Sequence, residues 1–298
     1  MSPKIDIKSG IFLLLLALLW GGSFFFAEIA LLEFQPITIA LNRVFWAVLI
    51  LFLIIRVRKI KLPRLKKIWF FYLIMGALNN AIPFSLIFWG QANVGSSLAS
   101  ILNGTTAIFG VIVAGLLLAD EKLSLNKIIG VGFGFFGVIM IMGFDVLYNF
   151  DPRNLAQLAI LGGALSYALA GVWAKTFLSE YSPIVNSFGM LLGATVILIP
   201  VTLAVDGIPS YPVRSDVFLS LISLGIFSTA FAYLLYFNIL KRAGSANLML
   251  VTLLIPPIAI GLSYIFLNKS FSAEGVYGFG FIAIGLLIID GRLKKYLK

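Results

Sequence analysis

Long apolar segments with almost no charge dominate this chain. Residues 128–144, IIGVGFGFFGVIMIMGF, hold no charged side chain, and similar runs recur from about residue 10 to residue 290. A helix needs about 20 such residues to cross the hydrocarbon core of a bilayer. Only 11% of the residues are charged, whereas soluble domains carry about 25%. The sequence therefore predicts an all-α integral membrane protein.

Ten segments are apolar enough to be spans, and the placement of basic residues orients them. The predicted spans are 10–31, 36–56, 68–90, 94–118, 126–143, 155–177, 182–205, 215–238, 244–267 and 273–290. Of the 22 Lys and Arg residues, all except Arg43, Arg153, Arg214 and Lys269 fall on one side of this arrangement. Because cytoplasmic loops are enriched in Lys and Arg, both termini are predicted to be cytoplasmic. The same rule explains the net charge of +10 without a nucleic-acid partner.

The composition removes several kinds of chemistry. The chain has no Cys and no His, which excludes disulfides, thiolate metal sites, histidine proton relays and Ser-His catalysis. It has no Walker A loop for ATP. The only acidic pair, Asp120-Glu121, lies in a joint between predicted spans. No enzyme activity, cofactor or metal is therefore expected.

Residues 130–137 match the glycine fingerprint of dinucleotide-binding loops. Gly132, Gly134 and Gly137 have the spacing G-x-G-x-x-G. A true fingerprint lies in a turn between a strand and a helix, whereas these glycines lie inside an uncharged span. Small residues also let membrane helices approach closely. We therefore interpret the glycines as helix-packing positions, with nucleotide binding as the weaker alternative.

The chain resembles itself at an offset of about 148 residues. GVGFGFFGVIMI, from Gly130, aligns with GFGFIAIGLLII, from Gly278, and FQPI at 34–37 aligns with YSPI at 181–184 when the offset is 147. Each half then contains five spans, and since five is odd the second half must enter the membrane inverted. Inverted repeats are the architecture of many secondary transporters, with the substrate site at the midplane between the halves. The predicted halves are residues 1–150 and 151–298.

Several stretches are similar to the EamA-type branch of the drug/metabolite transporter superfamily. They are LLWGGSFFFAEIAL in the first span, LNRVFWAVLILFL in the second, LLLADEKLSLNKIIGVGFGFFGVIMI across the fourth and fifth, and its echo FLNKSFSAEGVYGFGFIAIGLLII. The resemblance implies ten helices in two inverted repeats and export of amino acids or related metabolites. Other relatives carry sugars, nucleotide sugars, purines or S-adenosylmethionine. The echo has Asn268-Lys269 where the first copy has Asp120-Glu121, so no role that needs acids in both halves is implied.

Polar side chains near the middle of the spans are the candidates for a substrate cavity, because a membrane otherwise excludes them. The alternative for each is a hydrogen bond between helices. The candidates are Trp20, Ser23, Asn79, Asn80, Asn103, Thr105, Thr106, Tyr167, Ser228, Thr229, Tyr233 and Thr252. Aromatic walls are expected from Trp20, Phe84, Tyr167 and Trp173, with plain packing between helices as the alternative.

Four further residues suggest how such a cavity is controlled. Arg43 is the only basic residue well inside a span, and Glu28 lies near the outer end of the first span. They are predicted either to pair structurally or to form a carboxylate-binding or gating site. Pro256-Pro257 interrupts the ninth span; since proline kinks helices, this pair marks either a fixed kink or a hinge.

The sequence as a whole predicts a secondary transporter in the cytoplasmic membrane that exports amino acids or related small metabolites. The alternative is an importer or exchanger of a charged, nucleotide-like metabolite such as S-adenosylmethionine. Its expected partners are a small-molecule substrate and the lipid bilayer, and not nucleic acid. The chain is expected to be a monomer or a weak homo-oligomer.

Overall fold

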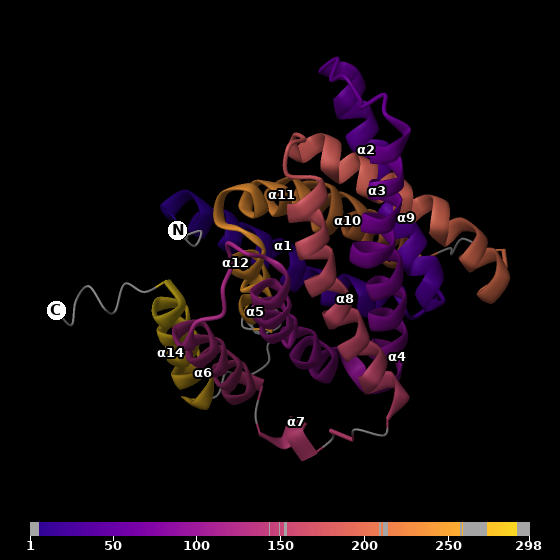
Figure 1. The fold of residues 1–298 in the computed structure, drawn as a ribbon. Coiled ribbons are helices and arrows are strands. Elements are labelled where there is room, and N and C mark those ends of the chain that lie inside the picture. Colours follow the sequence, from indigo (N-terminus) through magenta and orange to yellow (C-terminus); the bar gives the residue numbers. More distant parts are fainter. Residues whose placement is uncertain are drawn as a thin grey trace.

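The computed structural model is a bundle of helices, and it describes residues 6–142, 144–148, 150–151, 154–208, 210, 214–256, 258 and 273–290 (Figure 1). No strand occurs in these ranges. The helices are α1 (Ile7–Ala30), α2 (Pro36–Val57), α3 (Lys66–Gly76), η1 (Ala77–Ala81), α4 (Ile82–Gly104), α5 (Thr106–Leu117), α6 (Leu125–Met142), α7 (Asp145–Tyr148), α8 (Leu155–Phe177), α9 (Pro183–Val205), α10 (Ser215–Gly225), η2 (Ile226–Phe231), α11 (Ala232–Ala243), α12 (Ser245–Met249) and α14 (Ala273–Asp290).

Many of these helices are long enough to cross a bilayer. The described residues include seven helical stretches of at least 18 residues that are sufficiently apolar, and three shorter apolar helices, Leu125–Met140, Ser245–Pro256 and Tyr277–Ile289. Large apolar side chains such as Leu14, Leu53 and Leu116 are exposed on the outside of the bundle. Such a surface suits lipid rather than water, so the chain is a multi-pass membrane protein.

Local sequence sets the helix ends. Asp6 caps α1 by accepting a hydrogen bond of 2.9 Å from the backbone N–H of Ser9. Pro36 and Pro183 occupy the first positions of α2 and α9, where their missing N–H costs nothing. The predicted joint at Gln91 to Asn93 is wrong, because the helix continues until Gly95, whose φ of 80° breaks it.

Two wide turns occur at matching places in the two halves. The π-helical segments η1 and η2 follow Gly76 and Gly225, and Gly95 (φ 80°) is matched by Gly244 (φ 83°). Both glycine pairs are 149 residues apart in the chain. The internal resemblance therefore extends to backbone irregularities that sequence comparison does not reveal.

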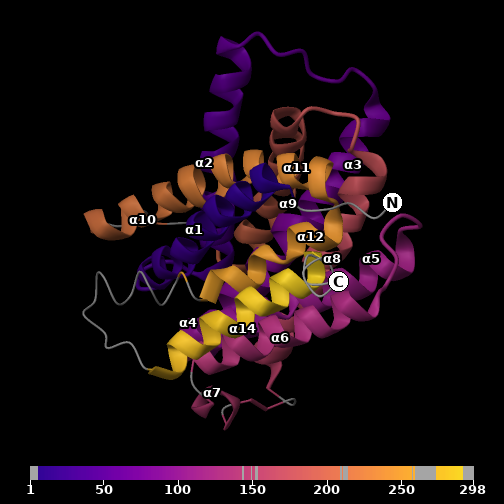
Figure 2. The same cartoon turned by 90° about the vertical axis from the view of Figure 1, so that its left-hand side faces the viewer.

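The glycines of the fingerprint-like motif pack one helix against another. Helices α6 and α14 lie side by side (Figures 1 and 2). A Cβ atom built on Gly130 would lie 2.5 Å from the side chain of Ile289 and 2.6 Å from the carbonyl oxygen of Gly285. A Cβ atom built on Gly137 would lie 2.5 Å from the carbonyl oxygen of Gly278. These contacts confirm the packing interpretation for Gly130 and Gly137. Gly132 has nothing within 4 Å of such an atom, so it is not a packing position.

The glycine motif lies within a continuous helix, so it lacks the strand and turn that a dinucleotide site requires. The nucleotide interpretation is therefore wrong. The two helices also run antiparallel, since Gly130 faces Gly285 while Gly137 faces Gly278.

Carboxylates link the halves at two places. Glu121 accepts hydrogen bonds of 2.7 Å from the backbone N–H groups of Ser245 and Ala246 at the start of α12. It also pairs with Lys175 near the end of α8. Elsewhere, Asp206 after α9 accepts hydrogen bonds from the backbone N–H and the hydroxyl of Thr38 in α2.

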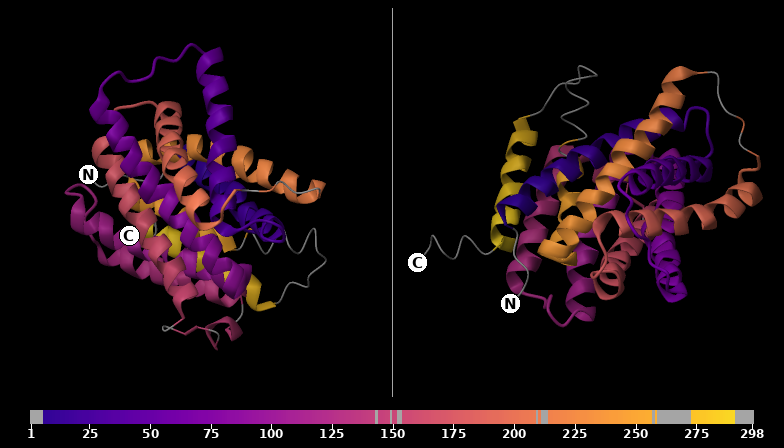
Figure 3. Two further views of the ribbon diagram at one scale, coloured as in Figure 1. Left: turned by 90° about the vertical axis from the view of Figure 1, so that its right-hand side faces the viewer. Right: turned by 90° about the horizontal axis from the view of Figure 1, so that it is seen from above.

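The basic segment between α2 and α3 and the short helix α7 lie at opposite ends of the molecule (Figures 2 and 3). The segment between α2 and α3, which carries the basic cluster of residues 56–67, projects beyond the bundle (Figure 3). The short helix α7 lies at the other end (Figure 2).

Candidate functional site

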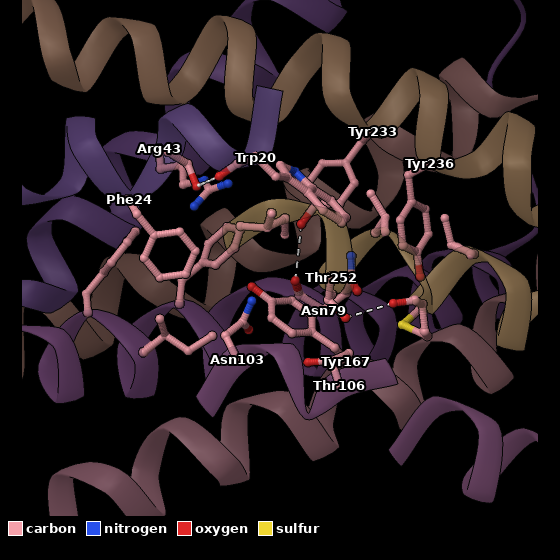
Figure 4. A pocket seen from close by; sticks show the side chains of 18 of the residues that line it. Trp20, Phe24, Arg43, Asn79, Asn103, Thr106, Tyr167, Tyr233, Tyr236 and Thr252 are labelled. Atoms are coloured by element: carbon pink, nitrogen blue, oxygen red, sulfur yellow. Dashed lines mark hydrogen bonds between the residues drawn. The ribbon is translucent and has the colours of Figure 1, made fainter. Parts of the chain in front are cut away.

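A cavity lies between helices of both halves (Figure 4). The cavity is narrow: the volume open to the centre of a water-sized sphere is about 50 Å³, which is room for a few water molecules, so the lining would have to move apart to hold a metabolite. The lining comes from α1, α2, η1, α4 and α5 in the first half and from α8, α11 and the helix that begins at α12 in the second. It consists of Trp20, Ser23, Phe24, Arg43, Asn79, Phe84, Ile87, Phe88, Gln91, Asn103, Thr106, Tyr167, Tyr233, Tyr236, Leu248, Met249, Val251, Thr252 and Ile255.

Most of the residues selected from the sequence lie on this lining. They are Trp20, Ser23, Asn79, Asn103, Thr106, Tyr167, Tyr233 and Thr252, with Phe84 as an aromatic wall. They come from helices far apart in the chain. Placing polar groups by depth therefore located the cavity.

Some candidates lie behind the lining. Asn80 donates a hydrogen bond of 2.7 Å to the hydroxyl of Tyr233 and so supports that ring. The hydroxyl of Ser228 donates to the carbonyl of Leu19. Trp173 is not a cavity wall, because its indole donates to the carbonyl of Phe71 and its ring packs on neighbouring phenylalanines.

Two of the four candidate threonines, Thr105 and Thr229, also have supporting roles. The hydroxyl of Thr105, which lies between α4 and α5, donates to the carbonyl of Leu102 in α4. Thr229 lies outside the lining, but its hydroxyl accepts a hydrogen bond from Arg43. These candidates thus fit the alternative of hydrogen bonds within the protein.

The side chain of Arg43 is held by the π-helical segment η2. Its Nε donates to the hydroxyl of Thr229 at 2.8 Å, and its Nη2 donates to the carbonyl of Ser228 at 3.0 Å. The guanidinium lies 4.0 Å from the centre of the Phe84 ring, a cation–π contact. The side chain is 5% exposed, so Arg43 is a buried cation with a fixed orientation.

The π-helical turn explains why a backbone carbonyl inside a helix can accept hydrogen bonds from side chains. A π turn replaces the usual i to i+4 bonding pattern with i to i+5, and such turns are common at functional sites. In η2 the carbonyl of Ser228 accepts from both Trp20 Nε1, at 3.1 Å, and Arg43 Nη2. In η1 the carbonyl of Asn79 similarly accepts from the hydroxyl of Tyr233, at 3.2 Å. Each π segment therefore binds side chains from the opposite half.

Aromatic rings form one wall of the cavity. The ring centroid of Trp20 is 6.1 Å from those of both Tyr233 and Tyr236, and the two tyrosines meet edge to face at 5.6 Å. Figure 4 shows Trp20 between Arg43 and these tyrosines. The wall can therefore contact a flat or apolar group, while Arg43 lies beside it.

Several polar atoms of the lining have no hydrogen-bond partner among the described residues. They are Asn79 Oδ1, Asn103 Oδ1, Gln91 Oε1, Thr106 Oγ1 and the hydroxyl oxygen of Tyr236. A buried polar atom without a partner is costly. A ligand in the cavity could supply the missing donors.

Sequence reasoning missed some of the lining. Gln91 was assigned to a joint, whereas it is buried and its Nε2 donates to the carbonyl of Phe24. Tyr236 lies one helical turn after Tyr233, and that spacing could have revealed it. Phe24 and Phe88 carry no polar signal and could not have been distinguished from packing residues.

The predicted control elements are only partly described. Glu28 is exposed and is not part of the lining, and the salt bridges between described residues include no Glu28–Arg43 pair. The gating role of Glu28 stays a prediction. Pro256 is buried within a helix, whereas Pro257 lies outside the described residues, so the hinge also stays a prediction.

Known proteins resemble this chain over most of its length. The family model described as the EamA-like transporter family matches residues 8–143 and again residues 154–290. An uncharacterized transporter of Bacillus subtilis (strain 168), YoaV, is 25% identical over 91% of this chain and 92% of its own length. An uncharacterized transporter of Archaeoglobus fulgidus is 26% identical over 95% of this chain and 99% of its own length.

Two further comparisons bear on activity and on fold. A probable terminal-alkyne amino-acid exporter of Streptantibioticus cattleyicolor is 23% identical over 70% of this chain and 68% of its own length. A protein of known crystal structure superposes with a TM-score of 0.77 at 16% identity, over 95% of this chain and 97% of that one. The second comparison supports the fold alone. Since the family model matches twice and covers nearly the whole sequence, the chain belongs to the EamA-like transporter family.

Proposed function

We propose that this protein is a secondary transporter that exports amino acids or related small metabolites across the cytoplasmic membrane by alternating access. The observation that carries this proposal is the cavity, which is lined from both halves of the chain by aromatic rings, amides, hydroxyls and one guanidinium. Such a lining can orient a small polar molecule and contact its apolar part. The named amino-acid exporter among the relatives supports the substrate class.

The proposal includes ten spans in two inverted halves, residues 1–150 and 151–298. The contacts of Gly130 with Gly285 and of Gly137 with Gly278 support it, because an offset of 148 residues exchanges one contact with the other. Alternating access then consists of rocking one half against the other around the cavity.

The salt bridges support the proposed orientation. Lys175 pairs with Asp120 and Glu121, and Arg242 pairs with Asp6; these are residues predicted to be cytoplasmic. Arg214 pairs with Glu33 and Asp216, which are predicted to lie outside.

Exchange of a nucleotide-like cation is the less favoured function. A sulfonium such as that of S-adenosylmethionine would be expected to use a carboxylate in its site. Among the described residues, the cavity lining includes Arg43 and no acidic side chain. This charge distribution favours a neutral zwitterion or an anion over a cation.

Counterflow into proteoliposomes tests the proposed function. Liposomes containing the purified protein would be loaded with single amino acids at high concentration and diluted into the labelled compound. Transient accumulation of label, absent from protein-free liposomes, is expected for at least one neutral amino acid. If no amino acid or related metabolite moved under any imposed gradient, the proposal would fail.

A further inference from the structure

We propose that Arg43 binds a carboxylate of the substrate, so that the transported molecules are acids or zwitterions with an apolar body. This inference rests on the proposed function, because it takes the cavity to be the substrate site. It adds the chemical group that the site selects and the side chain that selects it.

The guanidinium of Arg43 has donors left for a ligand. Its Nε and Nη2 bind the hydroxyl of Thr229 and the carbonyl of Ser228, whereas the hydrogen bonds of Arg43 to other described residues do not involve Nη1. Phe84 covers a face of the guanidinium rather than its edge. Arg43 belongs to the cavity lining, so a carboxylate in the cavity could reach the remaining N–H groups.

The charge of Arg43 has no counterion in the lining. The described residues around the cavity include no Asp or Glu, and none of the salt bridges between described residues involves Arg43. The contacts with Thr229, Ser228 and Phe84 orient the cation but do not neutralise it. An anionic group would be attracted strongly, because the buried site screens charge poorly.

The position equivalent to Arg43 in the second half holds an uncharged residue. Arg43 is seven residues after Pro36, and Met190 is seven residues after Pro183. Gly225 precedes η2, and a Cβ atom built on it would lie 3.3 Å from the carbonyl oxygen of Arg43. Gly76 precedes η1, and a Cβ atom built on it would lie 2.6 Å from the carbonyl oxygen of Met190. The two residues therefore occupy matching places against the two π segments.

Met190 shows that packing against a π segment requires no charge. Its sulfur accepts a hydrogen bond of 3.3 Å from Nδ2 of Asn79 in η1, as Arg43 contacts the equivalent residue Ser228 in η2. A structural role alone would thus be met by methionine in either half. We infer that the guanidinium is present for the ligand.

One guanidinium suits a carboxylate better than a phosphate. Arg43 is the only Lys or Arg on the lining formed by described residues. The planar edge of its guanidinium matches a carboxylate. A phosphate with two negative charges would leave one uncompensated in a buried site. The unpaired oxygens of Asn79 and Asn103 could accept hydrogen bonds from an ammonium group, which extends the match to α-amino acids.

The test compares acids with amides of the same shape. Detergent-purified full-length protein would be titrated with 3-phenylpropionate and 3-phenylpropanamide, and with L-phenylalanine and L-phenylalaninamide, while thermal unfolding is followed. Each acid is expected to bind about 10- to 100-fold more tightly than its amide, the range for a hydrogen bond to a charged group. Equal affinities for acid and amide, or no stabilisation by any acid, would overturn the proposal.

Variants then assign the selectivity to Arg43. Arg43→Met installs the residue that the other half carries, and it should abolish the preference for acids. Arg43→Lys should retain part of it, and the control Met190→Leu should retain all of it. An Arg43→Met protein that still prefers acids would contradict the assignment. If that variant does not fold, the acid and amide comparison on the natural protein and on Arg43→Lys decides.

Counterflow separates this inference from the proposed function. Selective binding of acids without any flux would leave the Arg43 site standing and overturn transport. Flux of amides as fast as acids would leave transport standing and overturn the role of Arg43.

Discussion

Glu121 and Lys175 form a salt bridge of 2.5 Å that joins the loop before α6 to the end of α8. The same carboxylate caps the start of α12 through the N–H groups of Ser245 and Ala246. Since α12 continues into the helix that carries Thr252 on the cavity lining, this carboxylate connects one end of the bundle to the candidate site.

Glu121→Gln should destabilise the protein by about 2–4 kcal/mol. Glu121 is 2% exposed, and the substitution removes a buried charge that has three partners. Thermal unfolding in detergent would measure the change. Asp120→Asn is the control, because Asp120 contacts the same Lys175 but is 57% exposed; its cost should stay below about 1 kcal/mol. Equal costs for the two variants would contradict the prediction.

The link between Asp206 and Thr38 should behave as a cap at the other end. Asp206 accepts at 2.7 Å from the backbone N–H of Thr38 and at 2.9 Å from its hydroxyl. Asp206→Ala should cost about 1–2 kcal/mol, as the loss of a helix cap does. A double-mutant cycle with Thr38→Val would isolate the hydroxyl contact. A coupling energy near zero would show that this contact contributes nothing.

Gly137→Ala should be much more damaging than Gly132→Ala. A methyl group at Gly137 would lie 2.5 Å from the carbonyl oxygen of Gly278, whereas one at Gly132 would meet nothing within 4 Å. We expect a loss of about 1–3 kcal/mol at Gly137 and a change within about 0.5 kcal/mol at Gly132. Size-exclusion profiles and melting temperatures of both variants would test this. If the two variants had the same melting temperature, the predicted close contact of α6 with α14 at Gly137 would be contradicted.

Tyr236→Phe and Tyr233→Phe should separate ligand binding from stability. The hydroxyl of Tyr236 is buried without a partner among the described residues, so its removal should leave stability unchanged or raise it. The hydroxyl of Tyr233 accepts from Asn80 and donates to the carbonyl of Asn79. Its loss should cost about 1–3 kcal/mol.

Transport by the two tyrosine variants adds a second readout. If the Tyr236 hydroxyl contacts substrate, counterflow should fall in Tyr236→Phe although the protein melts no earlier than the natural one. Unchanged counterflow together with unchanged stability would show that this hydroxyl has no role in the cavity.

The sequence predicted the helical membrane architecture and most of the cavity for a physical reason. Polar groups such as Asn103 and Thr252 are conspicuous in apolar spans, and counting residues gives their depth. Depth does not give the direction in which a side chain points. Asn80 and Ser228 have suitable depths, yet they lie behind the lining.

The π segments explain part of this difficulty. Within η1 and η2 the turn is wider than that of an α-helix, which rotates every following side chain relative to a regular helical pattern. No periodicity in the sequence marks such a turn. Gln91 was missed for another reason, because the break in its helix occurs at Gly95.

The difference between Arg43 and Met190 has a consequence for the kinetics of the proposed carrier. Two identical inverted halves, related by a two-fold axis in the membrane plane, would present the same affinity to both compartments. A cation in one half alone removes that equality. The empty carrier should therefore populate its inward-open and outward-open conformations unequally. The concentration for half-maximal flux should then differ between influx and efflux. For transport that is not coupled to an ion gradient, the maximal rates of influx and efflux must then differ in the same proportion.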